Sequence, residues 1–226
     1  MKIVMDTATF SHQIIQIIVV FFPFLIGIIF HELSHGLAAL KCGDPTAKLA
    51  GRLTLNPIPH IDPVGLGCFL VTSLFTPFVF GWAKPVPIFP AYFRNPRRDM
   101  IFVSAAGPLC NLFLAIALAL GLRLLVHAPS SFLDSSAAQF LAQMLLGGIS
   151  ANLILFLFNL IPVPPLDGSH IAACLLPSGI AAQLERSGKI GFAILALLLM
   201  TGGINYILMP ILNASYKFLL TYVAGL

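Results

Sequence analysis

Three side chains in one short stretch, His31, Glu32 and His35, form an H-E-x-x-H pattern. On a helix, residues four positions apart share a face, so both imidazoles could bind the same zinc ion. The intervening carboxylate could then take a proton from a water molecule that the metal activates. Residues 14–29, directly before the pattern, include no charged residue. Because ionisable groups are costly in such an apolar segment, we interpret the cluster as functional rather than as two buried histidines bonded to backbone.

A catalytic zinc ion usually has three protein ligands and an open position for water. His31 and His35 would supply two, so the third must come from elsewhere in the chain. We favour Asp167, because it lies in apolar sequence directly after a proline-rich stretch that ends a helix. His170 is the second candidate and His60 the third.

The composition indicates the kind of protein that must hold these side chains. The chain has 226 residues, of which 58% are hydrophobic and 9% charged. Since a soluble domain carries about 25% charged residues, we expect an all-α polytopic membrane protein. Its length suits one domain, 1–226, with about five or six membrane segments of ~20 residues each. The net charge of +4 is small and spread over loops, and it gives no support for nucleic-acid binding.

The first membrane segment, about Phe10 to Leu40, carries the H-E-x-x-H pattern in its last third, after Pro23 and Gly27. A turn-rich connection follows, in which the prolines at 57–63 prevent a helix and a short strand is possible near 51–56. For His60 and Asp62, a turn whose side chains bond to nearby backbone is the simpler interpretation.

The apolar stretch at 64–83 lies between two positively charged connections. The positive-inside rule places both connections in the cytoplasm, so we expect this stretch to be re-entrant or shallow. Their basic residues are Lys41, Lys48 and Arg52 before the stretch, and Lys84, Arg94, Arg97 and Arg98 after it.

The later segments then have a defined direction. We expect membrane helices at 101–126 and 140–161, a short helix from Asp167 to about 176, and a helical hairpin at 190–223 that is split by two glycines. If 64–83 does not cross, the first helix and the helix before Asp167 both run toward the cytoplasm, and their ends can meet there. Asn111, a polar residue in an apolar helix, suggests an interhelical hydrogen bond.

These motifs together resemble the site-2 protease family of zinc intramembrane metallopeptidases, in its small bacterial form without a PDZ or CBS domain. The resemblance extends from His31–Gly36 through Gly107–Asn111 to Asn159–Gly168, with further similarity at 51–65 and 81–87.

The resemblance implies a fold, a reaction and a set of roles. His31, His35 and Asp167 would bind one Zn²⁺ per chain, and Glu32 would be the general base. Asn111 and Asn159 would position substrate or polarise its carbonyl group. The substrate would be a transmembrane protein or peptide, and the enzyme would lie in the bacterial plasma membrane with its active site toward the cytoplasm. A separate hypothesis, motivated by Arg52-Leu53-Thr54-Leu55, is that the proline-rich and strand-like stretch at 51–63 pairs with the extended substrate backbone.

Two other function classes deserve comparison with this one. A metal-ion carrier could use the same four side chains as a transport site, but we find neither the inverted repeats nor the polar pathway that carriers usually have. A catalytically silent scaffold would not need Glu32, which is not a metal ligand in the expected arrangement.

Overall fold

The computed structural model describes residues 7–75 and 81–226, and in this part of the chain it contains helices and turns but no sheet. The all-α fold predicted from the sequence is therefore confirmed. The helices are α1 Thr7–Cys42, α2 Thr46–Leu49, α3 Pro63–Phe75, α4 Pro96–Val126, α5 Ser130–Leu133, α6 Ser136–Asn159, α7 Asp167–Leu175, α8 Ser178–Arg186, α9 Gly188–Met200 and α10 Gly203–Phe218. Single turns of other helix types occupy Ile58–His60, Pro90–Tyr92 and Leu219–Ala224.

Four of the described helices are long and apolar enough to cross a bilayer. They are Phe21–Cys42 within α1, α4, α6, and Gly203–Ala224, which joins α10 to the final turn. The two shortest of these, with 22 residues each, are about 33 Å long, enough for a hydrocarbon core of about 30 Å. Pro63–Leu74 and Gly188–Met200 are shorter apolar helices. The protein is a multi-pass membrane protein, and these six apolar helices agree with the predicted five or six segments.

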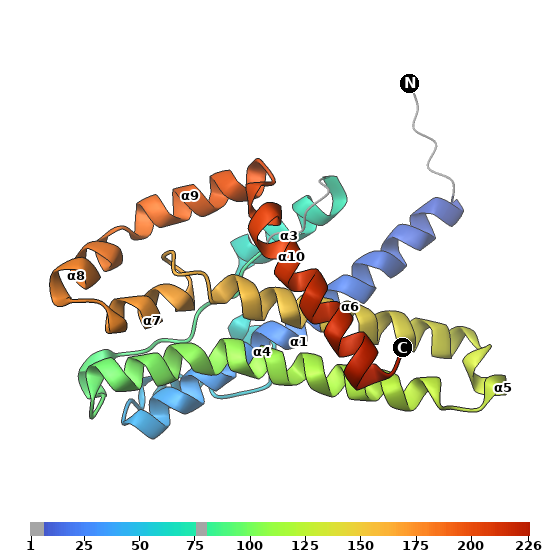
Figure 1. The fold of residues 1–226 in the computed structure, drawn as a ribbon, viewed down its shortest axis with the longest axis horizontal. Helices are drawn as coiled ribbons and strands as arrows, with labels where there is room; N and C mark the ends of the chain where they lie inside the picture. Colours follow the sequence, from blue (N-terminus) through green and yellow to red (C-terminus); the bar gives the residue numbers. More distant parts are fainter. Residues whose placement is uncertain (1–6, 76–80) are drawn as a thin grey trace.

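Helices α1, α4 and α6 form the packed centre of the molecule. α4 and α6 lie side by side, and α1 packs against both (Figure 1). Small residues let the helices approach closely: Ala115 and Ala119 of α4 are fully buried. A Cβ atom at Gly148 of α6 would lie 2.8 Å from Leu118 of α4. Close contact through small residues is the usual way in which membrane helices associate.

The segment at 64–83 leaves the α1 end and returns to it. α3 has 13 residues, about 20 Å of helix, and is too short to cross the hydrocarbon core. The two ends of the segment meet, because Ile61 and Ala83 form an isolated antiparallel bridge and the amide of Lys84 donates to the carbonyl of His60 at 2.9 Å. This agrees with the predicted re-entrant or shallow segment, of which residues 76–80 lie outside the described part.

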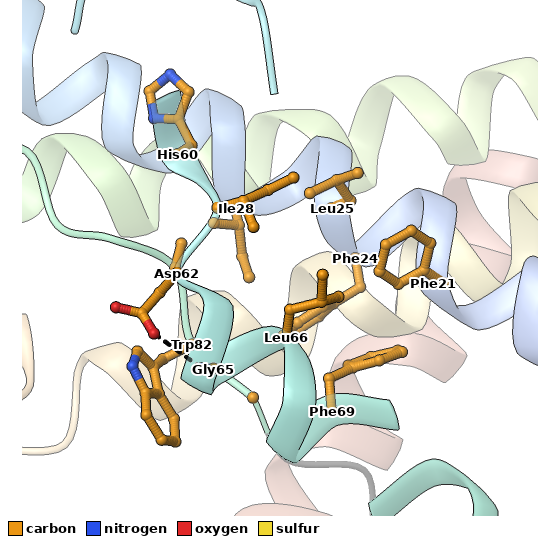
Figure 2. A pocket seen from close by; sticks show the side chains of 13 residues that line it. Phe21, Phe24, Leu25, Ile28, His60, Asp62, Gly65, Leu66, Phe69 and Trp82 are labelled. Atoms are coloured by element: carbon orange, nitrogen blue, oxygen red, sulfur yellow. Dashed lines mark hydrogen bonds between the residues drawn. The ribbon is translucent and has the colours of Figure 1, made fainter. Parts of the chain in front are cut away.

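α3 packs against α1 through aromatic rings. Phe69 stacks on Phe24, with ring centroids 5.6 Å apart, and contacts Phe21 edge to face. The two helices enclose a small apolar hollow of about 40 Å³, which His60 and Trp82 also line (Figure 2). Phe21 and Glu32 are 11 residues apart, about three helical turns, so this contact holds α3 near the side of α1 that carries Glu32.

The short strand predicted near 51–56 is wrong. The chain turns there instead: the hydroxyl of Thr54 accepts from the amide of Asn56, and the side chain of Asn56 accepts from the amide of Ile58. Gly51 adopts a positive φ of 67°, and Pro57 follows directly. Side-chain hydrogen bonds to the backbone and the nearby proline outweigh the strand propensity of Leu53-Thr54-Leu55. The pairing of residues 51–63 with an extended substrate, which this strand had motivated, stays a prediction.

The C-terminal part agrees with the predicted arrangement. α7 begins at Asp167, and α9 and α10 form a hairpin whose turn is Gly202, with φ of 71°. α7 packs against α4, whereas α10 packs against α6 (Figure 1). The packing of α7 on α4 is what brings Asp167 to the H-E-x-x-H end of α1.

Candidate metal centre

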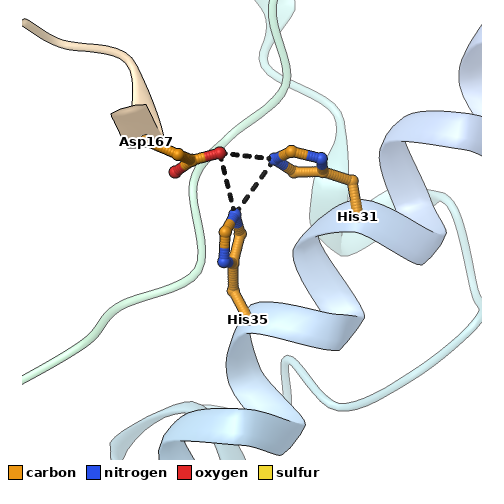
Figure 3. Close-up of side chains that lie close together, drawn as sticks. All are labelled: His31, His35 and Asp167. Atoms are coloured by element: carbon orange, nitrogen blue, oxygen red, sulfur yellow. Dashed lines mark hydrogen bonds and ion pairs between the residues drawn. The ribbon is translucent and has the colours of Figure 1, made fainter. Parts of the chain in front are cut away.

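The side chains of His31, His35 and Asp167 converge on one point (Figure 3). The Oδ2 atom of Asp167 lies 3.1 Å from Nε2 of His31 and 3.3 Å from Nε2 of His35. The two Nε2 atoms are 3.0 Å apart. One helical turn of α1 thus places both imidazoles beside a carboxylate that lies 132 positions farther along the chain than His35.

The turn between α6 and α7 aims Asp167 at the histidines. Prolines in residues 162–165 keep this stretch out of a helix, so α7 can start afresh at Asp167. The next residue must be small, because a Cβ atom at Gly168 would lie 2.6 Å from the carbonyl oxygen of Ile161. The hydroxyl of Ser169 donates to the carbonyl of Leu166 at 2.7 Å, which fixes the first turn of α7.

The opposite nitrogen of each imidazole is held by α4. Nδ1 of His35 lies 2.8 Å from the carbonyl oxygen of Val103, which can only accept, so this nitrogen carries the proton. Nδ1 of His31 lies 2.6 Å from Oδ1 of Asn111 and donates to it in the same way. Each Nε2 atom therefore presents a lone pair toward Asp167. This is the tautomer in which neutral histidine binds a metal.

A hydrogen-bond chain behind His31 crosses three helices. The Nδ2 atom of Asn111 donates to Oδ1 of Asn152 at 2.9 Å and to the carbonyl of Gly27 at 3.0 Å. Asn152 in turn donates to the carbonyl of Gly148 at 2.9 Å. Neither asparagine has more than 2% of its surface exposed. The interhelical hydrogen bond suggested by the sequence is present, and it orients His31. The predicted role of Asn111 in positioning substrate stays a prediction.

The sequence reasoning missed Asn152. The signal that singled out Asn111, a polar side chain inside an apolar helix, is also present at position 152 in α6. Burial of a polar group without a hydrogen-bond partner is costly, so such a residue indicates a polar neighbour on another helix.

Gly107 of α4 lies against the converging atoms. A Cβ atom there would overlap Nε2 of His35 and lie 2.7 Å from Nε2 of His31. The glycine thus leaves the space in which the three ligand atoms meet, and any larger residue would fill it.

The three side chains fit a zinc ion. Two neutral imidazole nitrogens and one carboxylate oxygen are a donor set that zinc binds in catalytic sites. In the described structure, Oδ2 of Asp167 is buried without a hydrogen-bond partner, although it lies closest to both histidines. A buried carboxylate oxygen with no hydrogen bond requires a cation to compensate its charge.

Glu32 lies beside this centre but does not belong to it. It is half-buried, and its Oε2 atom accepts a hydrogen bond of 2.7 Å from the amide of Val86. Its other oxygen, Oε1, does not take part in this hydrogen bond. A carboxylate next to the ligands, with one oxygen fixed, has the position expected of a general base.

The remaining predicted residues lie elsewhere. His60 is 1% exposed, and its Nε2 atom lies 2.9 Å from the carbonyl of Thr54. Asp62 accepts from the amides of Val64 and Gly65 and caps α3, as the simpler interpretation of this turn predicts. His170 is exposed. Asn159 is half-buried and donates to the carbonyl of Leu155 in its own helix, and its predicted role in positioning substrate stays a prediction.

Comparisons with known proteins agree with this chemistry. The profile described as Peptidase family M50 matches residues 125–202 of the chain. A Bacillus subtilis protein named "Putative zinc metalloprotease YwhC" is 43% identical over 185 residues, which cover 82% of this chain and 81% of that protein. A Mycolicibacterium smegmatis protein named "Putative zinc metalloprotease Rip2" is 30% identical over 188 residues, which cover 83% of this chain and 69% of that protein. No solved structure matches the chain significantly.

Proposed function

Because the chain belongs to peptidase family M50, it is a zinc metalloendopeptidase, and we propose that it cuts a peptide bond within or near a transmembrane helix of another membrane protein. The observation that carries this proposal is that His31 and His35, inside a helix apolar enough to span a bilayer, meet Asp167 at the start of α7. A peptidase whose reacting groups lie among such helices has the transmembrane helices of other proteins as its nearest substrates.

We assign the metal site to these three side chains, with one zinc ion per chain. Bound zinc supplies a Lewis acid that lowers the pKa of water and polarises a peptide carbonyl. Asn111 and the carbonyl of Val103 keep the protons on Nδ1 of the two imidazoles, so that both Nε2 lone pairs remain free for the ion.

Glu32 moves the protons of the reaction. Its Oε1 atom takes a proton from the attacking water as the new C–O bond forms. The same oxygen then gives that proton to the amide nitrogen as the C–N bond breaks, which releases a free amine and a carboxylic acid. Oε2 stays bound to the amide of Val86 throughout.

The substrate must present an accessible peptide bond to these groups. A helical amide is shielded by its own hydrogen bonds, so the substrate helix has to unwind locally before it is cut. The partners we propose are therefore a transmembrane protein or peptide and the lipid bilayer that delivers it. The positive charges around 41–52 and 84–98 support a plasma-membrane orientation with the active site toward the cytoplasm.

The test uses purified protein in liposomes together with a pool of fusion proteins, each a single transmembrane helix between two soluble reporter domains. Mass spectrometry of the products locates any cut. We compare zinc-loaded wild type with Glu32→Gln and Asp167→Ala, and measure zinc per chain by elemental analysis.

We expect wild type to hold about one zinc ion and to cut within or beside the apolar segment of at least one fusion. Glu32→Gln should keep the metal and lose cleavage, whereas Asp167→Ala should lose most of the metal. Cuts confined to the soluble reporters would contradict an intramembrane substrate. Full zinc in Asp167→Ala would mean that another residue is the third ligand.

A further inference from the structure

Residues 84–89, which we call the proline segment, pass over Glu32. Val86 lies between Pro85 and Pro87. Since proline has no backbone N–H group, the amide of Val86 is the one donor that these three residues offer. It donates to Oε2 of Glu32 at 2.7 Å, although the two residues are 54 positions apart.

The first end of the proline segment is fixed by hydrogen bonds. The amide of Lys84 donates to the carbonyl of His60 at 2.9 Å, and Nη2 of Arg52 donates to the carbonyl of Lys84 at 2.5 Å. Arg52 and His60 are both buried. Lys84, the first residue of the segment, is therefore held both by the turn after α2 and by the turn before α3.

The second end is fixed by Asp44. Its Oδ2 atom accepts from the amide of Phe89 at 2.6 Å, and its Oδ1 atom accepts from both the amide and the hydroxyl of Thr46. Burial disfavours the ionised carboxyl, but these hydrogen bonds outweigh burial and hold the pKa of Asp44 below its usual value. A buried carboxylate, 0% exposed, thus connects the proline segment to the end of α1.

The side chain of Val86 fixes the distance between the segment and α1. It is 6% exposed. A Cβ atom at Gly36 would lie 3.3 Å from Cγ1 of Val86 and 3.2 Å from Ala47. The glycine that follows His35 therefore lets the segment lie directly on the helix that carries Glu32.

From these contacts we propose that Val86 is a positioning residue, whose backbone amide holds the Glu32 carboxylate with Oε1 directed at the reacting water. This rests on the peptidase function proposed above. A glutamate side chain on a helix has three rotatable bonds, and fixing one oxygen removes most of that freedom before the substrate binds. The flanking prolines restrict φ at 85 and 87 and keep residues 84 and 86 extended, so the donor is itself held in place.

The first test needs no substrate. Because residues 85, 87 and 90 are prolines, a peptide that begins at Lys84 and ends at Pro90 keeps backbone amide hydrogens only at Val86, Ile88 and Phe89. Hydrogen–deuterium exchange of the whole zinc-loaded protein in detergent, followed by digestion, reports on these positions alone. We expect Glu32→Ala to speed the exchange of one amide in this peptide, whereas Glu32→Gln, whose carbonyl oxygen can still accept, should slow it back toward wild type.

Glu185→Ala is the matched control, because it removes an exposed carboxylate far along the chain. It should leave the exchange of the proline segment unchanged. Exchange that is equally fast in wild type and Glu32→Ala would overturn the proposal.

The second test separates the amide from the side chain. Val86→Pro removes the donor and keeps an apolar ring in an extended proline run, whereas Val86→Ala removes most of the side chain and keeps the donor. On the fusion protein that wild type cuts fastest, we expect Val86→Pro to lower kcat by about tenfold or more relative to Val86→Ala, as loss of an oriented base would. KM and zinc per chain should be similar in the two variants.

Two outcomes contradict the positioning role: equal kcat in both variants, or a loss that lies entirely in KM. If Val86→Pro does not fold, as loss of zinc would reveal, the exchange test decides. A wild type that cuts none of the fusion proteins would count against the proposed substrate class, whereas the hydrogen bond between Val86 and Glu32 would still be measured by exchange.

Discussion

Asn111 binds His31 through the nitrogen that faces away from Asp167: Oδ1 of Asn111 lies 2.6 Å from Nδ1 of His31. The asparagine is held in turn by Asn152 and by the carbonyl of Gly27. The orientation of one imidazole is thus set jointly by α1, α4 and α6. In metalloproteins, loss of such an outer partner typically costs 10- to 100-fold in metal affinity.

We therefore predict that Asn111→Leu weakens zinc binding by about 10- to 100-fold. Leucine keeps the branched shape of the asparagine side chain but cannot accept the proton of Nδ1, so His31 loses its preferred tautomer. Zinc affinity is measured by competition with a chelator. Asn213→Leu is the control, because Asn213 is exposed on α10. Equal affinity in all three proteins would show that the hydrogen bond does not orient the ligand.

Gly107→Ala should remove zinc from the protein. The added methyl group would overlap Nε2 of His35 and crowd Nε2 of His31, so both imidazoles would have to turn away. Elemental analysis of zinc per chain measures the loss. Gly179→Ala is the matched control, since a Cβ atom there has no neighbour within 4 Å. A Gly107→Ala protein with full zinc would mean that α4 can move back to make room.

Low pH should weaken the hydrogen bonds by which the Asp44 carboxylate holds Phe89 and Thr46. Its pKa is lower in the folded protein than in the unfolded chain, so its contribution to the free energy of unfolding is complete above the unfolded pKa, about 3.9, and is lost as pH falls. We predict that the difference in thermal midpoint between wild type and Asp44→Asn is largest at neutral pH and shrinks as pH falls below about 4.

The control for this measurement is Asp134→Asn, which changes an exposed carboxylate in the connection between α5 and α6. The thermal midpoint of Asp134→Asn should stay close to that of wild type across the same pH range. If the difference in thermal midpoint between wild type and Asp44→Asn did not change with pH, the Asp44 carboxyl would not be ionised in the folded protein.

The connection that includes residues 84–99 should face the cytoplasm. In a variant without the natural cysteines, Asn95→Cys should resist a membrane-impermeant maleimide in intact cells and react after lysis. Ser131→Cys, in the connection after α4, should react from outside, because α4 separates the two positions. Labelling of position 95 in intact cells would reverse the proposed orientation.

The sequence predicted the parts of the site that depend on local spacing. His31, Glu32 and His35 lie within one helical turn, so their arrangement follows from α-helix geometry alone. The choice of Asp167 needed a second step, namely that both positively charged ends of the 64–83 segment lie on one side. This could be inferred from the sequence because the distribution of Lys and Arg residues constrains the membrane topology, even where it does not constrain helix packing.

The rest could not be predicted, because it depends on contacts between distant parts of the chain. The amide of Val86 is a backbone group, and no residue type marks it as the partner of Glu32. Asn152 carried a signal, but its partner could not be named before α4 and α6 were packed. The wrong strand near 51–56 had a local cause: Thr54 and Asn56 bond to nearby amides, and these turns prevailed over strand propensity.

The return of the 64–83 segment to its starting side has a consequence for how this protein can change. Between the end of α1 and the start of α7, the described part of the chain has two helices long and apolar enough to cross the bilayer, α4 and α6. Because the number of crossings between them is even, Asp167 lies on the same side of the bilayer as the two histidines. An insertion in that interval can preserve the metal centre only if it adds an even number of crossings. One extra crossing, however stable, would leave two ligands on one side of the bilayer and the third on the other.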